Sequence, residues 1–375
     1  MRPKRRPKRK SFFSAAGFFC AVAVLLLAGS IGYSLGQRLA ERHGGGDLAT
    51  SAAAFGSLPW AEWLPGADIP PTDRGPGTDA DPANRLPGTD TSPADQSPGT
   101  WPQDAVAAFP FTLHFLDVGQ ADCLLALSGG QSLLIDAGNA ADGDAIIQYL
   151  RAQGINQLDY VIATHPHEDH IGGLPAVLRA FPADTLIMPP KAHTTRIFED
   201  ALLAIEESSL AVTLPNPGDI YPLGEASFTI LGPVGEYGEQ LNNWSVGILL
   251  TVGERRFLLC GDAEAQAEQD MLDAYPGELW ADVLKLSHHG SDTSSTAVFL
   301  DQAAPVFAVL SCGDGNLYGH PHEKTMSALR QREISLFRTD KQGTVIVGSD
   351  GRGLYWNASP TEDYSPGAGQ ASDRE

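Results

Sequence analysis

The sequence predicts an α/β domain of the layered-sandwich type, preceded by one transmembrane helix and a disordered linker. Between residues 106 and 358, short apolar runs typical of strands alternate with amphipathic stretches typical of helices. An uncharged apolar segment lies near the N-terminus, and a stretch rich in proline, glycine and aspartate follows it. A domain of about 250 residues is large for one core but reasonable for several packed layers.

The N-terminal segment is predicted to anchor the chain in the cell membrane. Residues 1–10 contain seven Lys or Arg and no acid, and residues 11–36 are uncharged and mostly apolar. Because about 20 apolar residues span a bilayer, this run is long enough for a single-pass signal-anchor. The basic segment should stay in the cytoplasm, which places the domain on the extracytoplasmic side. The alternative is a cleaved signal peptide and a secreted protein, although Ser30 stands where a lipoprotein would need Cys.

Residues 37–105 are predicted to form a disordered, semi-extended linker. They are dense in Pro, Gly, Asp, Thr and Ser, and Pro-Gly-Thr recurs at Pro76, Pro87 and Pro98. Such a composition offers too little apolar surface to bury. The polar residues 359–375 are expected to be a disordered tail for the same reason.

The elements of the domain follow from the apolar periodicity. Strands are expected at 111–116, 123–127, 132–135, 160–163, 226–231, 246–252, 257–260, 283–287, 306–311, 343–347 and 354–356. Helices are expected at 144–152, 174–180, 196–207, 263–274, 294–302 and 322–332. Gly253-Glu254 is the predicted turn of a hairpin.

The expected strand 160–163 leads into the most informative motif of the chain. His165, His167, Asp169 and His170 follow it in the order H-x-H-x-D-H. Three imidazoles and a carboxylate are crowded at this strand end, and the imidazoles would repel one another once protonated. A bound cation therefore explains this group of side chains best. A lone His is usually a structural or surface residue, but four metal-binding side chains at this spacing indicate a metal site.

Two later motifs supply further ligand types. The apolar run 258–260 ends in Gly261-Asp262, and the run 283–286 is followed by Ser287 and the pair His288-His289. Taken alone, the first would be a turn and the second a solvated loop. In this order after the H-x-H-x-D-H motif, they are interpreted as metal ligands.

These motifs resemble those of the metallo-β-lactamase superfamily and, more finely, the soluble domain of the bacterial competence proteins ComEC/Rec2 and its free-standing relatives. The resemblance is carried by the motifs above together with 115–122, 134–138, 261–264, 284–291 and 316–321. It spans about residues 109–356 and implies an αββα sandwich with metals at one edge between the two sheets. Six motifs in order are specific for the family and much less specific for the substrate.

The resemblance implies a metal-dependent hydrolase with two divalent ions. By this resemblance His165 and His167 hold metal one, Asp169, His170 and His289 hold metal two, and Asp262 bridges the ions. A water shared by two such ions becomes a hydroxide nucleophile near neutral pH. Asp136 would orient a ligand His through its other ring nitrogen, and the alternative is a turn carboxylate before Gly138.

One departure from the family pattern concerns metal one. The superfamily usually supplies a third His before the strand that leads to the bridging Asp, where this chain has Leu241-Asn242-Asn243-Trp244-Ser245. The only His between His170 and Asp262 is His193, which lies much nearer the first motif. Asn242, Asn243 or water would then complete metal one, which leaves zinc and manganese both open because an amide oxygen suits a harder ion.

Several polar residues that follow strand ends are candidates for contacting the substrate. Beside Asp169 and Asp262, His288 and His320 are expected to be catalytic. The other candidates for contacting the substrate are Ser291, Tyr318, Lys285 and Glu264. Lys285 could instead be a solvated strand residue. Glu264 stands in a Gly-Asp-x-Glu sequence resembling that of phosphorylcholine esterases, where the carboxylate faces choline; the alternative is a first-turn helix glutamate.

The charge of the domain limits its substrates. Residues 105–358 contain 13 Lys and Arg against 32 Asp and Glu, a net charge of −19. Proteins that grip a phosphate backbone normally have a basic surface, so strong nucleic-acid affinity is disfavoured. The leading hypothesis is a membrane-anchored phosphodiesterase acting on DNA or on a cell-envelope polymer. The alternatives are a hydrolase of carboxylic esters or amides, including lactones and lactams, and a non-catalytic binding module; the sequence identifies no protein partner.

Overall fold

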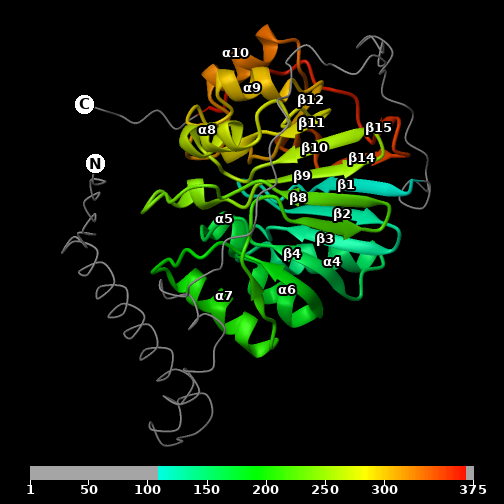
Figure 1. The fold of residues 1–375 in the computed structure, drawn as a ribbon, viewed down its shortest axis with the longest axis vertical. Helices are drawn as coiled ribbons and strands as arrows, with labels where there is room; N and C mark the ends of the chain where they lie inside the picture. The colour runs from blue at the N-terminus through cyan, green and yellow to red at the C-terminus, as the bar shows by residue number, and fades with distance from the viewer. Residues whose placement is uncertain (1–108, 369–375) are drawn as a thin grey trace, which may run out of the picture. The chain divides into compact units, whose positions relative to one another are not determined.

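The computed structural model describes residues 109–368, which form two facing β-sheets with helices on the outer face of each (Figure 1). The predicted α/β sandwich is therefore confirmed. The basic segment 1–10, the expected transmembrane run 11–36 and the linker 37–105 lie outside the described residues. Within residues 109–368, no helix has the length and apolar character needed to cross a bilayer.

The first sheet has the strand order β15-β14-β1-β2-β3-β4-β5-β6. Its strands are β1 (Phe111–Phe115), β2 (Leu124–Ser128), β3 (Gln131–Ile135), β4 (Leu158–Ile162), β5 (Ala183–Ile187), β6 (Val212–Thr213), β14 (Val345–Ser349) and β15 (Leu354–Trp356). Strands β3 to β6 run parallel, and the remaining pairs are antiparallel. The parallel part ends at the edge that carries the first metal motif.

The second sheet has the order β13-β12-β11-β10-β9-β8-β7. Its strands are β7 (Ile220–Leu223), β8 (Ala226–Ile230), β9 (Ile248–Val252), β10 (Arg255–Leu259), β11 (Val283–Lys285), β12 (Phe307–Leu310) and β13 (Ser335–Arg338). Strands β10 to β13 are parallel, and β9 joins β10 through the predicted turn at Gly253-Glu254. Gly253 has φ 54° there, a conformation that costs other residues more than glycine.

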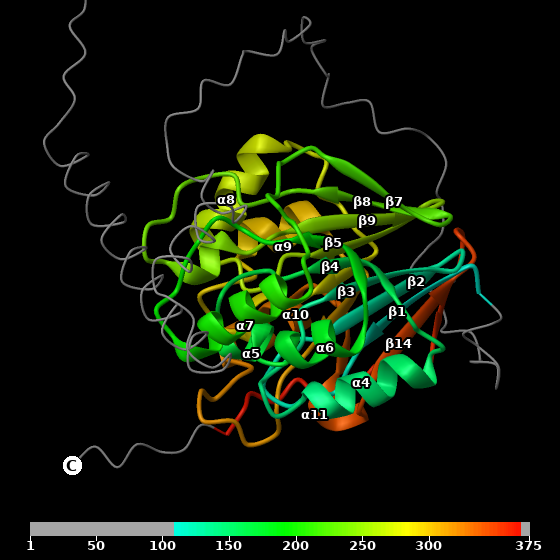
Figure 2. The same ribbon diagram turned by 90° about the horizontal axis from the view of Figure 1, so that it is seen from below.

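The helices cover the two outer faces, with α4, α6 and α7 on the first sheet and α8, α9 and α10 on the second (Figures 1 and 2). They are α4 (Gly143–Ala152), α5 (Glu168–Ile171), α6 (Leu174–Ala180), α7 (Arg196–Glu207), α8 (Ala265–Ala274), α9 (Ala297–Ala303), α10 (Glu323–Gln331) and α11 (Thr339–Gln342), with 3₁₀ turns at η3 (Leu241–Trp244) and η4 (Ser287–Gly290).

Alternation along the strands divides the core into three layers. Phe111, Leu113 and Phe115 of β1 point between the sheets, where Phe228 and Phe257 meet them. The alternate strand residues, whose side chains point away from the other sheet, pack beneath the helices on each outer face. Successive side chains of a strand point to opposite faces of the sheet. Consecutive apolar residues therefore indicate a strand that is covered on both faces.

Several short elements were not predicted. They are β5, β6, β7, β13, α5 and α11, all of five residues or fewer. The helix expected from Ala263 begins at Ala265, because Glu264 is extended and Ala265 N–H donates to Thr293 O at 3.0 Å. Short elements carry little periodicity, and tertiary pairing decides them.

The folded domain extends beyond residue 358. Residues 359–368 were expected to belong to a disordered tail, but Thr361 forms an antiparallel bridge with Leu336 on the edge strand β13. Thr361 N–H donates to Leu336 O at 2.7 Å. The composition of the segment did not indicate this contact, because the groups that order the segment lie outside it. They are the backbone of the edge strand and the guanidinium of Arg338.

Candidate metal centre

The chemistry-bearing residues lie where parallel strands of both sheets end. Asp136 follows β3, and the H-x-H-x-D-H motif follows β4. In the second sheet, Asp262 follows β10 and His288-His289 follow β11. The carboxyl ends of parallel strands face one edge, so segments far apart in sequence meet there.

Left-handed backbone conformations aim several of these side chains. Asp136 has φ 58°, and His288 and His289 have φ 52° and 53°. Non-glycine residues in this region cost energy and persist where the surrounding structure fixes them, commonly at functional sites. The turn at His288-His289 is what directs two consecutive imidazoles into the same region.

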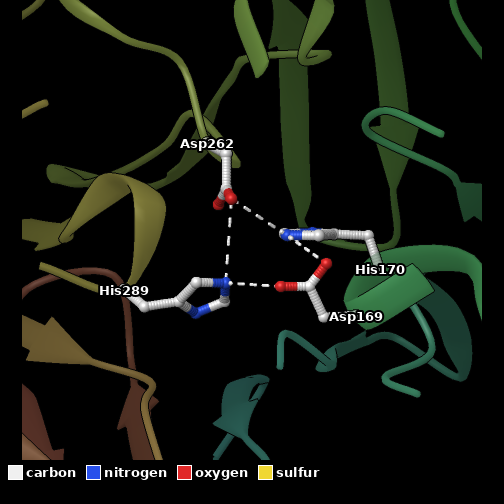
Figure 3. Close-up of side chains that lie close together, drawn as sticks. All are labelled: Asp169, His170, Asp262 and His289. Carbon is white, nitrogen blue, oxygen red and sulfur yellow. Dashed lines mark ion pairs between the residues drawn. The ribbon is translucent and has the colours of Figure 1, made fainter. Parts of the chain in front are cut away.

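Asp169, His170, Asp262 and His289 converge into one group (Figure 3). Each offers a ligand atom, and these atoms lie within 4.8 Å of one another. His170 Nε2 is 3.2 Å from Asp262 Oδ2, and His289 Nε2 is 3.3 Å from Asp169 Oδ2. These are the four residues assigned by resemblance to metal two and to the bridge.

The electrostatics of this group fit a divalent cation. His170 Nε2, His289 Nε2 and Asp262 Oδ1 are buried and have no hydrogen-bond partner among the described residues. Burial opposes protonation of His170, but Asp262 and Asp136 outweigh it and hold its pKa well above the usual value. Burial would raise the pKa of Asp262, yet His170 and His289 hold it well below. The carboxylates therefore require positive charge, which a metal ion supplies with unprotonated imidazoles.

Asp136 and Thr164 hold His170 from behind. His170 Nδ1 is 2.8 Å from Asp136 Oδ2, and the same carboxylate accepts from Thr164 N–H at 2.8 Å and from the Thr164 hydroxyl at 2.7 Å. Nε2 of the ring then faces the ligand group. A carboxylate on the second nitrogen fixes the tautomer and orientation of a metal-ligating His.

Asp122 is a site residue that the sequence reasoning missed. Its carboxylate pairs with Lys285 and lies 3.5 Å from His289 Nδ1 and 3.8 Å from His170 Nδ1. Lys285 and Asp122 are each 1% exposed, so Lys285 neither reaches the opening nor is solvated. Asp122 ends one of the motifs that carry the family resemblance, and that position was the available signal.

The two residues assigned to metal one contact each other, and His165 also approaches the bridging Asp262. His165 Nε2 lies 2.9 Å from His167 Nδ1 and 3.9 Å from Asp262 Oδ2. Ser245, in the stretch that replaces the usual third His, contacts His165 Nδ1 at 3.3 Å. The ring of His193 is 5.9 Å from that of His167, so this His lies near metal one despite its distance in sequence from the expected position.

The two Asn candidates differ. The amide of Asn243 is used within the protein, because Nδ2 donates to Gln240 at 2.8 Å and Oδ1 accepts from Glu264 N–H at 2.9 Å. Asn242 Nδ2 donates to Glu264 at 3.2 Å, and its buried Oδ1 has no hydrogen-bond partner in residues 109–368. Of the two, only Asn242 has an amide oxygen free to accept.

His288 is oriented toward the metal group by a polar cluster. His288 Nδ1 lies 3.1 Å from Thr293 Oγ1 and 3.4 Å from Glu264 Oε1, and Nε2 lies 3.9 Å from Asp262 Oδ2. Glu264 is bound to Thr293, Asn242 and His288, which gives it a positioning contact rather than a first-turn helix role, since α8 starts after it. Ser291 is buried, and its hydroxyl contacts Thr293 Oγ1 at 3.1 Å.

His320 is buried next to this cluster. Its ring is 5.4 Å from His288 and 6.3 Å from His289, and it stacks on Tyr318 at 5.6 Å. Burial and neighbouring His288 lower the pKa of His320 to about 4, so the ring is neutral at pH 7. A cavity of about 350 Å³ opens beside Asp169 and is lined in part by Leu317 and Tyr318, which are 72% and 69% exposed.

A fold of two helix-covered sheets with this ligand group defines a metal-dependent hydrolase class, and the chain belongs to the metallo-beta-lactamase superfamily, whose model matches residues 116–314. It is similar to ComE operon protein 3 of Bacillus subtilis, with 31% identity over 67% of this chain and 34% of that protein. It is also similar to competence protein ComA of Neisseria gonorrhoeae, with 30% identity over 66% of this chain and 35% of that protein. The predicted relationship to ComEC/Rec2 proteins is confirmed, and the chain spans about a third of the length of these relatives.

Among solved structures, the metallo-beta-lactamase fold protein YhfI of Bacillus subtilis is similar in fold. It has 16% identity and a TM-score of 0.41, over 61% of this chain and 96% of that chain.

Proposed function

We propose that this chain is a metal-dependent phosphodiesterase. The observation that carries the proposal is the group of Asp169, His170, Asp262 and His289, with unpaired buried ligand atoms facing one another. Two divalent ions, zinc or manganese, bound at this edge would activate a water molecule and offset the charge of the attacked ester. His165 and His167, with Asp262, would hold the more weakly bound ion.

The residues around the group have separable tasks. Asp136 keeps Nε2 of His170 turned toward the ligand group. The partly exposed His288 and the buried His320 lie beside the group, where their ring nitrogens would contact the oxygens of a phosphoryl group. The consecutive left-handed residues at 288–289 fix the relative directions of a ligand His and a substrate-facing His.

The substrate is a DNA diester or an envelope polymer diester. One relative is named a competence protein and another a recombination protein, which favours DNA. The net charge of −19 in residues 105–358 disfavours tight binding along a polynucleotide, and the cavity beside Asp169 is lined by Glu168 without Lys or Arg. We therefore expect weak, salt-sensitive binding of DNA and cleavage that depends on the bound ions.

The test is turnover of bis(p-nitrophenyl) phosphate by the metal-loaded protein, with added zinc or manganese. Asp262→Ala should abolish turnover, and Asp144→Ala, an exposed residue of α4, should leave it unchanged. Cleavage of a lactam or lactone alone would refute the phosphodiesterase proposal in favour of a carboxyl hydrolase. Metal binding without turnover of either class would indicate a binding module.

We further propose that residues 11–36 anchor the chain in the membrane with the domain outside the cytoplasm. The support is the basic segment before an uncharged apolar run and the linker after it. Protease added to intact cells should release the domain by cutting within 37–105. Cutting that occurs only after lysis would reverse the proposed topology, and release without protease would indicate a cleaved signal peptide.

A further inference from the structure

The segment 359–368, called here the C-terminal strap, connects the edge strand β13 to the loop 311–322 that bears His320, called here the His320 loop. It begins on the edge strand β13, where Thr361 pairs with Leu336. It ends where Gly367 N–H donates to Pro321 O at 2.8 Å. The strap thus connects the edge of the second sheet to the backbone next to a residue that lines the metal group.

Arg338 fastens the middle of the strap. This side chain is 2% exposed, and Nη1 donates to the carbonyls of Asp363 and Ser365 at 3.1 and 2.8 Å. The other guanidinium nitrogens hold the Asp340 carboxylate at 2.9 and 2.8 Å. Two main-chain carbonyls of the strap therefore accept from Nη1 of a buried guanidinium whose other nitrogens are held by Asp340, which ties the path of the strap to the core.

Tyr364 adds a second point of attachment. Its hydroxyl donates to Ile334 O at 2.8 Å, and its ring packs against the core beneath α9 and α10. Between these attachments, a cavity of about 490 Å³ lies between the strap and α10, lined by Glu323 and Arg330 among others. The strap is therefore held at a few directional contacts rather than by continuous close packing.

The far end of the strap leaves no room for a side chain. A Cβ placed on Gly367 would lie 2.1 Å from His320 O and 2.8 Å from Gly319 C. Both atoms are backbone of the His320 loop, so any larger residue must displace the loop or the strap. The loop is held on its other side by Asn316, whose Oδ1 accepts from His320 N–H at 3.0 Å, and by Gln120, whose Nε2 is 3.3 Å from His320 Nδ1.

We propose that the C-terminal strap is a positioning element of the hydrolase site, which holds the His320 loop against the metal group from behind. Arg338 binds the strap carbonyls and Tyr364 attaches the strap to Ile334, so these residues act on the site through the strap. The ligand group lies on other loops, so its metal affinity should not depend on the strap. The catalytic part of this inference rests on the proposed function, whereas the structural part does not.

The test compares full-length Gly367→Val with Ala368→Val, which adds a similar volume at the adjacent exposed position. Hydrogen exchange is measured at the loop amides of Gly313, Gly319 and His320, of which the first donates to the side chain of Gln120 and the other two donate to Asn316. Gly367→Val should speed exchange at these amides, lower kcat/KM for the diester by roughly 10- to 100-fold, and leave the bound metal per chain unchanged. Ala368→Val should match the wild type in all three measurements.

Two further variants keep the test decisive if Gly367→Val folds poorly. Tyr364→Phe removes one hydrogen bond, and a chain ending at 358 is compared with one ending at 368. Equal loop exchange in the chains ending at 358 and 368 would overturn the inference. Faster loop exchange in a protein whose wild type cleaves no diester would support the strap and refute the proposed function. Loss of metal together with activity would instead show a general structural role and also overturn it.

Discussion

The buried pair of Lys285 and Asp122 yields a quantitative prediction. Lys285→Met removes the ammonium but keeps most of the side-chain volume, and it leaves the Asp122 carboxylate buried. Breaking a buried ion pair from one side typically costs about 3–5 kcal/mol. We expect a value near the lower end, about 3 kcal/mol, because His289 Nδ1 and His170 Nδ1 remain 3.5 and 3.8 Å from Asp122.

Urea unfolding at pH 7 measures this cost, with Lys324→Met as the matched control on an exposed turn of α10. The control should leave the unfolding midpoint unchanged. Lys285→Met should lower it, and adding Asp122→Asn should recover a large part of the loss, because the uncompensated charge is then gone. A loss below about 1 kcal/mol for Lys285→Met, or no recovery in the double variant, would refute the account of this pair.

Three other predictions concern the metal and pH. Chelation with EDTA should abolish hydrolysis and lower the melting temperature, since bound ions hold charged ligands together; an unchanged melting curve would contradict the metal centre. Asp136→Asn should weaken metal affinity by about 10- to 100-fold in a competition titration, with Asp144→Asn as the control; equal affinities would show that the contact to His170 does not orient the ligand. Burial lowers the pKa of His114 from 6.5 to about 4, so the folded form stays neutral while the unfolded form takes up a proton as pH falls below 6.5. This group contributes its full stability above 6.5 and loses about 2 kcal/mol of it between pH 7 and 5. His114→Gln should reduce the acid dependence of urea unfolding by that amount, and an unchanged slope would contradict it.

The sequence predicted the parts of the fold that repeat a pattern over many residues. The helix at Arg196–Glu207 and the hairpin around Gly253 were predicted because apolar spacing and turn chemistry are local signals. Strands β5 and β13 were missed because each contains only two consecutive large apolar residues beside polar ones, and pairing with β4 and β12 determines them. The strap was missed because a polar segment can be ordered by donors such as Arg338, which composition does not reveal.

The candidate site was predictable in the same uneven way. Residues in dense motifs, such as His170 and His289, meet as the family resemblance implied. Asp122 and Ser245 lie far from the other motifs in sequence, and only the fold brings them to the imidazoles. Lys285 was predicted to contact the substrate because it lies at a strand end, but its side chain points to the buried Asp122, with which it forms an ion pair.

The four ligands of Figure 3 come from both sheets, with Asp169 and His170 following β4 and Asp262 and His289 following β10 and β11. A partly synthesised chain that ends before β10 contains Asp169 and His170 but lacks Asp262 and His289, so it cannot assemble the group. An ion bound by all four residues would therefore be captured only once the second half of the domain has folded. Metal supply at that location, as well as the chemistry of the candidate ligands, would then decide which element the protein carries.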